Sequence, residues 1–390
     1  MKILHYLRSL DPAIGGVVQV VMDTCALLAG AGHRVTLATT DPHGHDQPAG
    51  PSDPSPLHGK LRVVAVPPVR TNMRSLNKAQ RDQVSGLLRD AEVVHIHGMW
   101  ERSPWQVARL GLRAGARLVV NPHGMLDCAP MRDGWLKKRV FLRLYSAPVL
   151  ARASAVVCAS DEELAQSRPW LRPGVGRVIP FPIPLGAAAE SPADAPTPDP
   201  TPHEQRPVVF LGRVHPIKRI ETLIDAMGRP GSGWRLCVAG PEEDAAYAAW
   251  LRRRAASAGV SARIEWAGMV SGAAKAALLR SALCLALPSL HENFGAVIFE
   301  ALAHGAPVIV GTGVLLWGQI HAADAGLVAQ AGAHSWSEAI ESLRRSAERR
   351  DELAQRGVAW ARAMCDPATL AAAWHECYAA QPAGSSATRA

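Results

Sequence analysis

The sequence lacks any long hydrophobic segment. Hydrophobic residues make up 48% of its 390 residues, yet no apolar run approaches the roughly eighteen residues of a membrane-spanning helix. The first ten residues, MKILHYLRSL, carry His5 and Arg8 where a signal peptide would be apolar. We therefore expect a cytoplasmic protein with a sizeable core, whose contact with a membrane, if any, is peripheral.

Paired cysteines and a strong charge of one sign are also missing. The seven cysteines are scattered singly through apolar stretches without a C-x-x-C pair, which predicts reduced core thiols rather than disulfides or a zinc site. An excess of 42 Lys and Arg over 34 Asp and Glu gives a net charge of +8. This modest excess suits an anionic ligand or an acidic membrane surface, and no nucleic-acid-binding module accompanies it.

Short apolar runs alternate with helical segments in the first half of the chain. Since the runs do not alternate cleanly with polar residues, they predict strands covered on both faces, as in a parallel sheet. The intervening helices are expected at Val17–Ala29 and Leu76–Arg89. The expected strands are Lys2–Leu7, Arg34–Thr39, Leu61–Val66, Glu92–Ile96, Arg117–Asn121 and Ser154–Ala159.

A proline-rich segment, 184–206, separates this half from a second unit of the same kind. Such a segment buries little apolar area and is stiffened by its prolines, so it is predicted to be a linker. We therefore predict an α/β fold of two Rossmann-like, doubly wound parallel-sheet domains, 1–183 and 207–366, followed by a helix at 367–380 and a frayed tail at 381–390. The strands expected in the second domain are Val208–Leu211, Arg235–Ala239, Arg263–Trp266, Leu283–Leu287 and Pro307–Val310.

The strongest functional signal is the stretch PSLHENFGAVIFEALAHGAPVIV, residues 288–310. A strand ends at its start, a loop carries Glu292 and Asn293, and a helix begins near Phe294–Gly295. The free N–H groups of a helix N-terminus receive phosphate well, and glycine lets a ligand approach closely. The carboxylates of Glu292 and Glu300 only accept hydrogen bonds, so they suit hydroxyls on either side of that phosphate. A nucleotide-diphosphate sugar has this combination of groups.

Two other stretches carry groups suited to a diphosphate. Arg213 and Lys218 follow a predicted strand, at the carboxyl edge where open α/β sheets bind ligands. Two cations there can neutralise a diphosphate and stabilise a leaving group. Gly15 and Gly16 form a tight turn after the first strand and can bring backbone N–H groups to a phosphate, although this signal alone is weak.

These motifs, in this order, resemble the retaining GT-B glycosyltransferases of family 4, and the matching order covers nearly the whole chain. The element E-x7-E formed by Glu292 and Glu300, with its N-F-G core, is the most specific part. The resemblance implies two domains facing a cleft, with the last helix, Pro367–Ala379, crossing back to the first domain. It also implies sugar transfer from a nucleotide-diphosphate sugar, which is a substrate, with no metal and no cofactor.

The resemblance also implies roles for individual residues of the second domain, all of them in donor binding. Lys218 and Glu292, together with Arg213, would further be catalytic. The implied donor contacts are Arg213 and Lys218 at the diphosphate, Glu292 with the backbone of Asn293, Phe294 and Gly295 at the transferred sugar, Glu300 at the ribose, and the backbone of Met269–Val270 at the base.

In the first domain the resemblance places Gly15 and Gly16 at the diphosphate and His123 near the transferred sugar, as a further catalytic residue. His123 lies in N-P-H-G-M-L-D, residues 121–127. This stretch and W-L-K-K-R, residues 135–139, are similar to members that assemble bacterial polysaccharides. The expected acceptor is therefore a glycan or a lipid-linked glycan.

His97, Trp100 and Asp127 are candidate acceptor contacts, because they follow predicted strands at the same edge of the sheet. A packed tryptophan and a helix-capping aspartate are the alternatives for two of them. Residues 135–145 interleave four cations with aromatic and aliphatic residues, which is typical of an interfacial helix on anionic headgroups and equally of an ordinary amphipathic helix.

One departure from the family concerns the end of the first domain, where many relatives have Asn-Gly and this chain has Phe181-Pro182. The sequence nevertheless predicts a hexosyltransferase of exopolysaccharide or lipopolysaccharide assembly that works by front-side displacement at the cytoplasmic face of the membrane. A nucleotide-sugar epimerase of the same fold and a catalytically silent nucleotide-sugar-binding scaffold are the alternatives.

Overall fold

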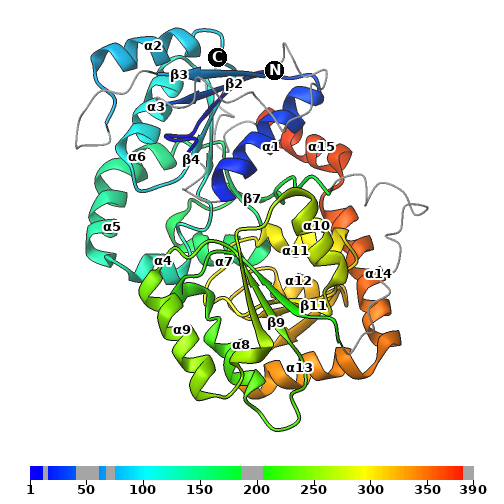
Figure 1. Ribbon diagram of the computed structural model, residues 1–390. Helices are drawn as coiled ribbons and strands as arrows, with labels where there is room; N and C mark the ends of the chain where they lie inside the picture. The colour runs from blue at the N-terminus through cyan, green and yellow to red at the C-terminus, as the bar shows by residue number, and fades with distance from the viewer. Residues whose placement is uncertain (12–15, 41–60, 67–74, 186–204, 381–390) are drawn as a thin grey trace. The chain divides into compact units, whose positions relative to one another are not determined.

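A computed structural model describes residues 1–11, 16–40, 61–66, 75–185 and 205–380 of the chain (Figure 1). The chain forms two compact units. Unit 1 contains Met1–Pro182 and Asp366–Ala390, and unit 2 contains Ile183–Cys365. Most of the expected linker and all of the expected tail lie outside the described residues.

Unit 1 is built on a parallel sheet of seven strands in the order β3-β2-β1-β4-β5-β6-β7. The first six strands lie where the sequence predicts them, whereas β7 is too short and too exposed to leave an apolar run. The strands are β1 Lys2–Tyr6, β2 Arg34–Thr39, β3 Leu61–Ala65, β4 Val93–His97, β5 Arg117–Asn121, β6 Ala155–Cys158 and β7 Gly176–Val178.

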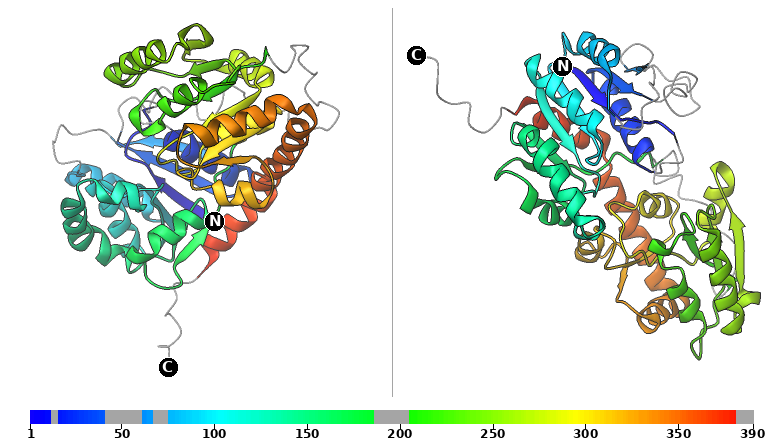
Figure 2. Two further views of the ribbon diagram at one scale, coloured as in Figure 1. Left: turned by 90° about the horizontal axis from the view of Figure 1, so that it is seen from below. Right: turned by 90° about the vertical axis from the view of Figure 1, so that its left-hand side faces the viewer.

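Helices cover both faces of this sheet (Figures 1 and 2). One face packs against α1 (Gly16–Gly30) and α15 (Pro367–Ala379). The other packs against α2 (Lys78–Leu88), α3 (Arg102–Arg113) and α6 (Ala147–Leu150). The return of the last helix to unit 1 agrees with the crossing helix that the resemblance implies. The remaining helical segments are α4 Cys128–Arg132, α5 Trp135–Phe141, a π-helical segment Leu142–Ser146 and α7 Asp161–Ser167.

The two-residue period of the strands decides which helices each side chain meets. In β4, Val94 and Ile96 belong to the core on the α2 and α3 side. His95 and His97 alternate with them and therefore point toward α1 and α15. His5 in β1 pairs in register with His95. Three histidines thus occupy positions on a sheet face whose other buried side chains are mainly apolar.

Unit 2 is built on a parallel sheet of six strands in the order β10-β9-β8-β11-β12-β13. Its strands are β8 Val208–Leu211, β9 Leu236–Ala239, β10 Ile264–Gly268, β11 Cys284–Leu287, β12 Val308–Gly311 and β13 Leu327–Ala329. Its helices are α8 Glu221–Met227, α9 Ala245–Ser257, α10 Gly272–Ser281, α11 Ala296–Ala303, α12 Trp317–Ala322, α13 Ala333–Arg345 and α14 Ala347–Met364.

Both sheets reverse their strand order beside their first strand, between β1 and β4 and between β8 and β11. Open α/β sheets bind ligands at the carboxyl ends of the strands at such a switch point. The predicted α/β fold with two Rossmann-like units is confirmed, and each unit has one such position.

The prediction that all cysteines are core thiols is wrong for Cys128. All seven cysteines are free, and six are buried, but Cys128 is exposed. It begins α4, and the next residue, Ala129, is exposed as well, so this first turn of the helix does not belong to the core.

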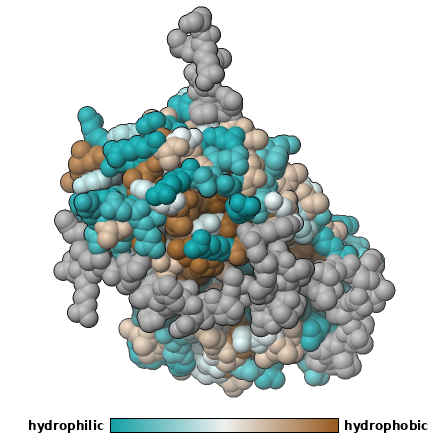
Figure 3. All heavy atoms as spheres, turned by 90° about the horizontal axis from the view of Figure 1, so that it is seen from above, coloured by the Kyte–Doolittle hydropathy of each residue, from teal (hydrophilic) through white to brown (hydrophobic). Residues whose placement is uncertain are grey.

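The described surface is mainly hydrophilic on the face that Figure 3 shows, with apolar side chains gathered in local patches. Among the described residues, no helix combines the length and the hydropathy that crossing a membrane requires.

Candidate functional site

The loop after β11 holds Glu292 in a fixed position. The Glu292 N–H donates to the carbonyl of Gly313 (2.9 Å), and the Glu292 carbonyl accepts from the N–H of Leu315 (2.9 Å). Gly295, at the N-cap position of α11, has a left-handed φ of 68°. The left-handed φ favours glycine, and a Cβ at this position would also lie 2.9 Å from Ile298 Cδ1, which would have to shift.

The residues between them anchor the start of α11. Phe294 is buried, and its ring stacks on Phe299 with 4.8 Å between centroids. Asn293 is half-buried in the same loop. The backbone of Asn293–Gly295 is therefore held rigidly where the helix offers its free N–H groups.

Lys218 reaches Glu292 from the loop after β8. The N–H of Ile217 donates to Nδ1 of His215 (3.2 Å) at the start of the short 3₁₀ turn Pro216–Lys218. The Lys218 ammonium then forms an ion pair with the Glu292 carboxylate, and the two side chains are 13% and 21% exposed. The structure therefore brings together two of the residues that the sequence predicts at the diphosphate and the transferred sugar.

The other two predicted charged residues of the donor site have different partners. Arg213 forms an ion pair with Glu243 (2.7 Å), and Glu300 forms one with Lys275 (2.9 Å). Sequence reasoning missed Glu243 and Lys275. Glu243 follows β9 and Lys275 lies in the first turn of α10 after β10, so their signal was a position after a strand at the carboxyl edge of the sheet.

Two predicted backbone contacts are less well defined. Val270, half-buried, and Met269, 75% exposed, form the connection between β10 and α10. Gly16 is the first residue of α1, and Gly15 lies outside the described residues.

In unit 1, His123 lies in a turn that few residues other than glycine adopt. Its φ is 53°, in the left-handed region. The His123 N–H donates to Oδ1 of Asn121 (3.2 Å), and Gly124 follows with a φ of 73°. An uncommon backbone conformation held by specific hydrogen bonds is typical of functional positions.

Glu163 fixes this turn and was missed in the sequence. Its buried carboxylate accepts hydrogen bonds from the N–H groups of Gly124 and Ala159, both at 2.6 Å. Its own N–H donates to the hydroxyl of Ser160, the N-cap of α7 (3.1 Å). The S-x-x-E pattern of residues 160–163 is typical of a capping box at a helix start, and it could have pointed to Glu163 in the sequence.

His97 is buried in contact with His123 rather than exposed. Its Nδ1 lies 2.9 Å from His123 Nε2, and its Nε2 lies 3.0 Å from His5 Nδ1. Because both ring nitrogens of His97 have partners, a direct acceptor contact finds no support in this arrangement.

Trp100 adopts the packed alternative. Its ring meets Phe141 edge to face with 6.1 Å between centroids, and the Lys138 ammonium lies 5.4 Å from its centroid. Both partners belong to α5. This packing connects the end of β4 to the segment that the sequence singles out for membrane contact.

Asp127 is fully buried at the N-cap position of α4, but its side chain makes no capping hydrogen bond to that helix. Burial, and next the carboxylates of Glu163 and Glu162, raise the pKa of Asp127 to about 8. Its carboxyl group is therefore mostly protonated at neutral pH, and the expectation of a simple cap is wrong.

Comparisons with known proteins agree with this layout. A family model described as glycosyl transferase 4-like domain matches residues 15–182, and one described as glycosyl transferases group 1 matches residues 196–360. D-inositol 3-phosphate glycosyltransferase from Mycobacterium bovis is 36% identical over 110 residues, which are 28% of this chain. The match spans about a quarter (23%) of the length of that curated relative.

Solved structures share the fold over nearly the whole chain. Anabaena HepE in complex with UDP and glucose superposes with a TM-score of 0.72 at 18% identity, covering 98% of this chain and 100% of HepE. WaaG, a glycosyltransferase involved in lipopolysaccharide biosynthesis, gives a TM-score of 0.62 at 16% identity, with coverage of 98% and 100%. With both family models and this fold, the chain belongs to the group 1 glycosyltransferases, of family 4 type and GT-B fold.

Proposed function

We propose that this protein is a retaining hexosyltransferase that uses a nucleotide-diphosphate sugar to extend a glycan or lipid-linked acceptor in exopolysaccharide or lipopolysaccharide assembly. The observation that carries the proposal is the Lys218–Glu292 ion pair at the switch point of the unit 2 sheet, beside the N-terminus of α11. A cation, a carboxylate and free helix N–H groups side by side suit a ligand with both a phosphate and sugar hydroxyls.

The charged pairs of unit 2 can exchange their partners for the donor. A diphosphate at α11 competes with Glu292 for the Lys218 ammonium, which leaves carboxylate oxygens for hydroxyls of the transferred sugar. Glu300, paired with Lys275, is proposed to accept from the ribose in the same way. Arg213 forms an exposed ion pair with Glu243. Such pairs contribute about 0–1 kcal/mol, so breaking this one to recruit Arg213 to the diphosphate costs little.

We propose front-side displacement as the mechanism. The bond between the anomeric carbon and the diphosphate oxygen breaks while the acceptor oxygen approaches from the same side, and the leaving phosphate takes the acceptor proton. Lys218, Arg213 and the N–H groups at the start of α11 stabilise the charge on the leaving group. In this scheme protein cations do this work, and the reaction is proposed to proceed without a metal ion. His123 in unit 1 is proposed to bond a hydroxyl of the transferred sugar.

Contact with an acidic membrane is proposed for the segment 135–145. Four of its apolar side chains are at least half exposed, and they lie among cations of the same segment; they are Trp135, Leu136, Val140 and Leu144. Beside it is a pocket of about 420 Å³ with Arg132, Arg139 and Trp170 in its lining. Guanidinium groups and aromatic faces suit phosphates and sugar rings, so we propose this pocket for the headgroup of a lipid-linked acceptor at the inner face of the cytoplasmic membrane.

A vesicle-binding experiment tests the membrane contact. Wild type should float with vesicles rich in phosphatidylglycerol, and Leu136→Ser with Leu144→Ser should abolish flotation. The control is Leu290→Ser, which removes a 60% exposed leucine from unit 2. Equal flotation of all three proteins would exclude the segment as the membrane contact.

The donor site is tested by thermal shift with a panel of nucleotide diphosphates and their sugars. UDP-hexoses come first because HepE binds UDP and glucose. A donor at one hundred times its Kd stabilises the protein by about 2.7 kcal/mol, and Lys218→Ala should lose that shift. Donor binding without transfer to any acceptor would favour the scaffold alternative, and donor conversion without acceptor would favour the epimerase.

A further inference from the structure

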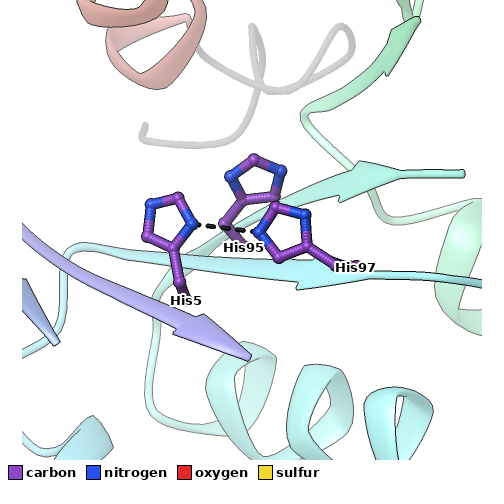
Figure 4. Close-up of side chains that lie close together, drawn as sticks. All are labelled: His5, His95 and His97. Carbon is purple, nitrogen blue, oxygen red and sulfur yellow. Dashed lines mark hydrogen bonds between the residues drawn. The ribbon is translucent and has the colours of Figure 1, made fainter. Parts of the chain in front are cut away.

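A continuous hydrogen-bonded chain of four histidines and one tyrosine lies inside unit 1. His123 Nε2 lies 2.9 Å from His97 Nδ1, and His97 Nε2 lies 3.0 Å from His5 Nδ1, the bond dashed in Figure 4. His5 Nε2 lies 3.4 Å from the Tyr378 hydroxyl, which lies 2.9 Å from His95 Nδ1. The chain therefore extends from the strained turn of His123 to the last helix, α15.

Every member of the chain is buried, and His123 is the most exposed at 8%. Burial lowers the pKa of His5 and of His123 to about 3. The pKa values of His95 and His97 are also well below the usual range, because of burial first and of neighbouring histidines second. At physiological pH all four imidazoles are neutral, so each has one N–H donor and one bare acceptor nitrogen.

One proton on each ring allows only two arrangements of the whole chain. If the Tyr378 hydroxyl donates to His95, it accepts from His5 Nε2–H, and His97 and His123 must then also carry their protons on Nε2. If it donates to His5 instead, all four histidines carry their protons on Nδ1. The tautomers of the four rings are thus coupled, and the direction in which the Tyr378 hydroxyl donates determines all of them.

The two ends of the chain distinguish these arrangements. His123 Nδ1 and His95 Nε2 are buried without a hydrogen-bond partner among the described residues. A buried N–H without a partner is the rarer and costlier defect. The Nε2 arrangement leaves such an N–H on His95, deep against Trp374 (5.3 Å between centroids). The Nδ1 arrangement leaves it on His123, the one member of the chain for which a sugar contact is proposed, and that contact would supply the missing acceptor.

We propose that Tyr378, His5 and His97 are positioning residues for His123, and that the chain makes His123 a donor, through Nδ1–H, to a sugar oxygen. The inference rests on the proposed role of His123 beside the transferred sugar. Through Tyr378, helix α15 would thus influence how His123, in the turn after β5, binds its ligand. The three histidine ligand atoms of His5, His95 and His97 also lie within 4.8 Å of one another, so a bound metal ion is the competing explanation of the cluster.

The tautomers can be measured directly in the full-length protein labelled with ¹⁵N-histidine. Long-range ¹H–¹⁵N spectra should show the Nδ1–H form for all four buried histidines. Mixed tautomers within the chain, the Nε2–H form throughout, or stoichiometric metal in the purified protein would each overturn the proposal. This measurement needs neither substrate nor variant, so it is independent of the proposed function. Uniform Nδ1–H tautomers in a protein without transferase activity would refute the proposed function but would still support the hydrogen-bonded chain of histidines.

Variants then test the link to the reaction. Tyr378→Phe keeps the packing but removes the hydroxyl that links His5 to His95. It should lower kcat about fivefold, the effect of one hydrogen bond, with little change in the KM for the donor. Tyr6→Phe is the matched control, because Tyr6 is equally buried on the opposite face of β1 and its hydroxyl is not a member of the histidine chain. Equal kcat for the two variants would overturn the positioning role.

A second pair of variants separates local support from coupling along the chain. His97→Asn can still bond His123 from the Nδ1 position but cannot reach His5, whereas His97→Leu loses both bonds. We expect His97→Asn to retain more activity than His97→Leu, and its His5 tautomer to become independent of that of His123. Equal loss in both variants with unchanged His5 and His123 tautomers would contradict the coupling along the chain.

Discussion

The candidate site residues of the two units differ in charge. In unit 1, His123 and its partners are neutral and almost fully buried. In unit 2, Lys218 and Glu292 form an ion pair that is still partly exposed. In the proposed site, charges that can exchange partners meet the diphosphate, while the Glu292 carboxylate and the neutral His123 meet the transferred sugar. The contrast is therefore between charged groups that rearrange for the donor and a neutral group that is already in place.

The contrast originates in where each unit carries these residues. His5, His95 and His97 belong to strands, and the register turns them toward a face that α15 covers. Lys218 and Glu292 lie on loops beyond the ends of β8 and β11. Strand positions under a helix exclude water and favour neutral forms, while loops at a sheet edge keep charges partly solvated.

The largest expected effect is that of acid on stability: lowering the pH should unfold unit 1 before unit 2. Burial lowers the native pKa values of His5 and His123 to about 3 and those of His95 and His97 well below 6.5. Just below pH 6.5, therefore, only the unfolded state takes up their protons. Stability is therefore lost as the pH falls from 6.5, by up to about 1.4 kcal/mol per pH unit for each histidine. Asp127 and Asp23, whose native pKa values are raised, offset part of this loss.

Hydrogen–deuterium exchange of the full-length protein at pH 7 and pH 5 measures this difference. Peptides that contain β4 should lose protection on acidification before those that contain β11. In unit 2, among the described residues, only His291 has a resolved lowered histidine pKa, owing to burial. Earlier loss of protection in β11 would show that the neutral histidines are not the acid-sensitive element.

Removing one charge from unit 2 should have the next largest effect, on catalysis. Lys218→Ala or Glu292→Ala should each cost about 2–4 kcal/mol in kcat/KM, since each removes a preorganised electrostatic group. Arg252→Ala is the control, because it breaks an exposed ion pair with Glu242 in the same unit. Steady-state kinetics with the donor from the thermal-shift panel gives the comparison, and wild-type turnover by Lys218→Ala would refute the site.

Much of the fold was predictable because parallel strands covered on both faces leave uninterrupted apolar runs. β2, β5 and β8 have the predicted bounds. β7 and β13, each of three residues, were missed because strands so short leave little pattern. The last helix was predicted from Asp366 followed by Pro367, and the Asp366 carboxylate indeed accepts from the N–H of Thr369 (2.7 Å).

Positions in the candidate site could be predicted where one local motif contains them, and not where segments distant in the sequence meet. Glu292 and Gly295 lie in one loop, and the sequence indicates both. The hydrogen bonds of His5 with His97 and Tyr378 join residues that are 92 and 373 positions apart in the sequence. Single histidines in apolar runs are more often core residues, so the contact among these three residues becomes visible only from the register of β1 with β4 and the return of α15 to unit 1.

The smallest expected effect is the pH dependence of stability that comes from Asp127, an acidic residue of unit 1 whose raised pKa favours its neutral form. Its native pKa of about 8 means that the folded protein holds a proton which the unfolded chain, with a carboxyl pKa near 4, releases. Stability should therefore fall as the pH rises toward 8, by at most about 1.4 kcal/mol per pH unit. Between pH 6.5 and 8 this signal is separate from the buried histidines and from Asp23, whose pKa is about 6. Asp127→Asn imitates the protonated form. Its free energy of unfolding, measured with urea, should therefore change less with pH over this range than that of wild type. Equal pH dependence of the two proteins would show that Asp127 is ionised in the native state.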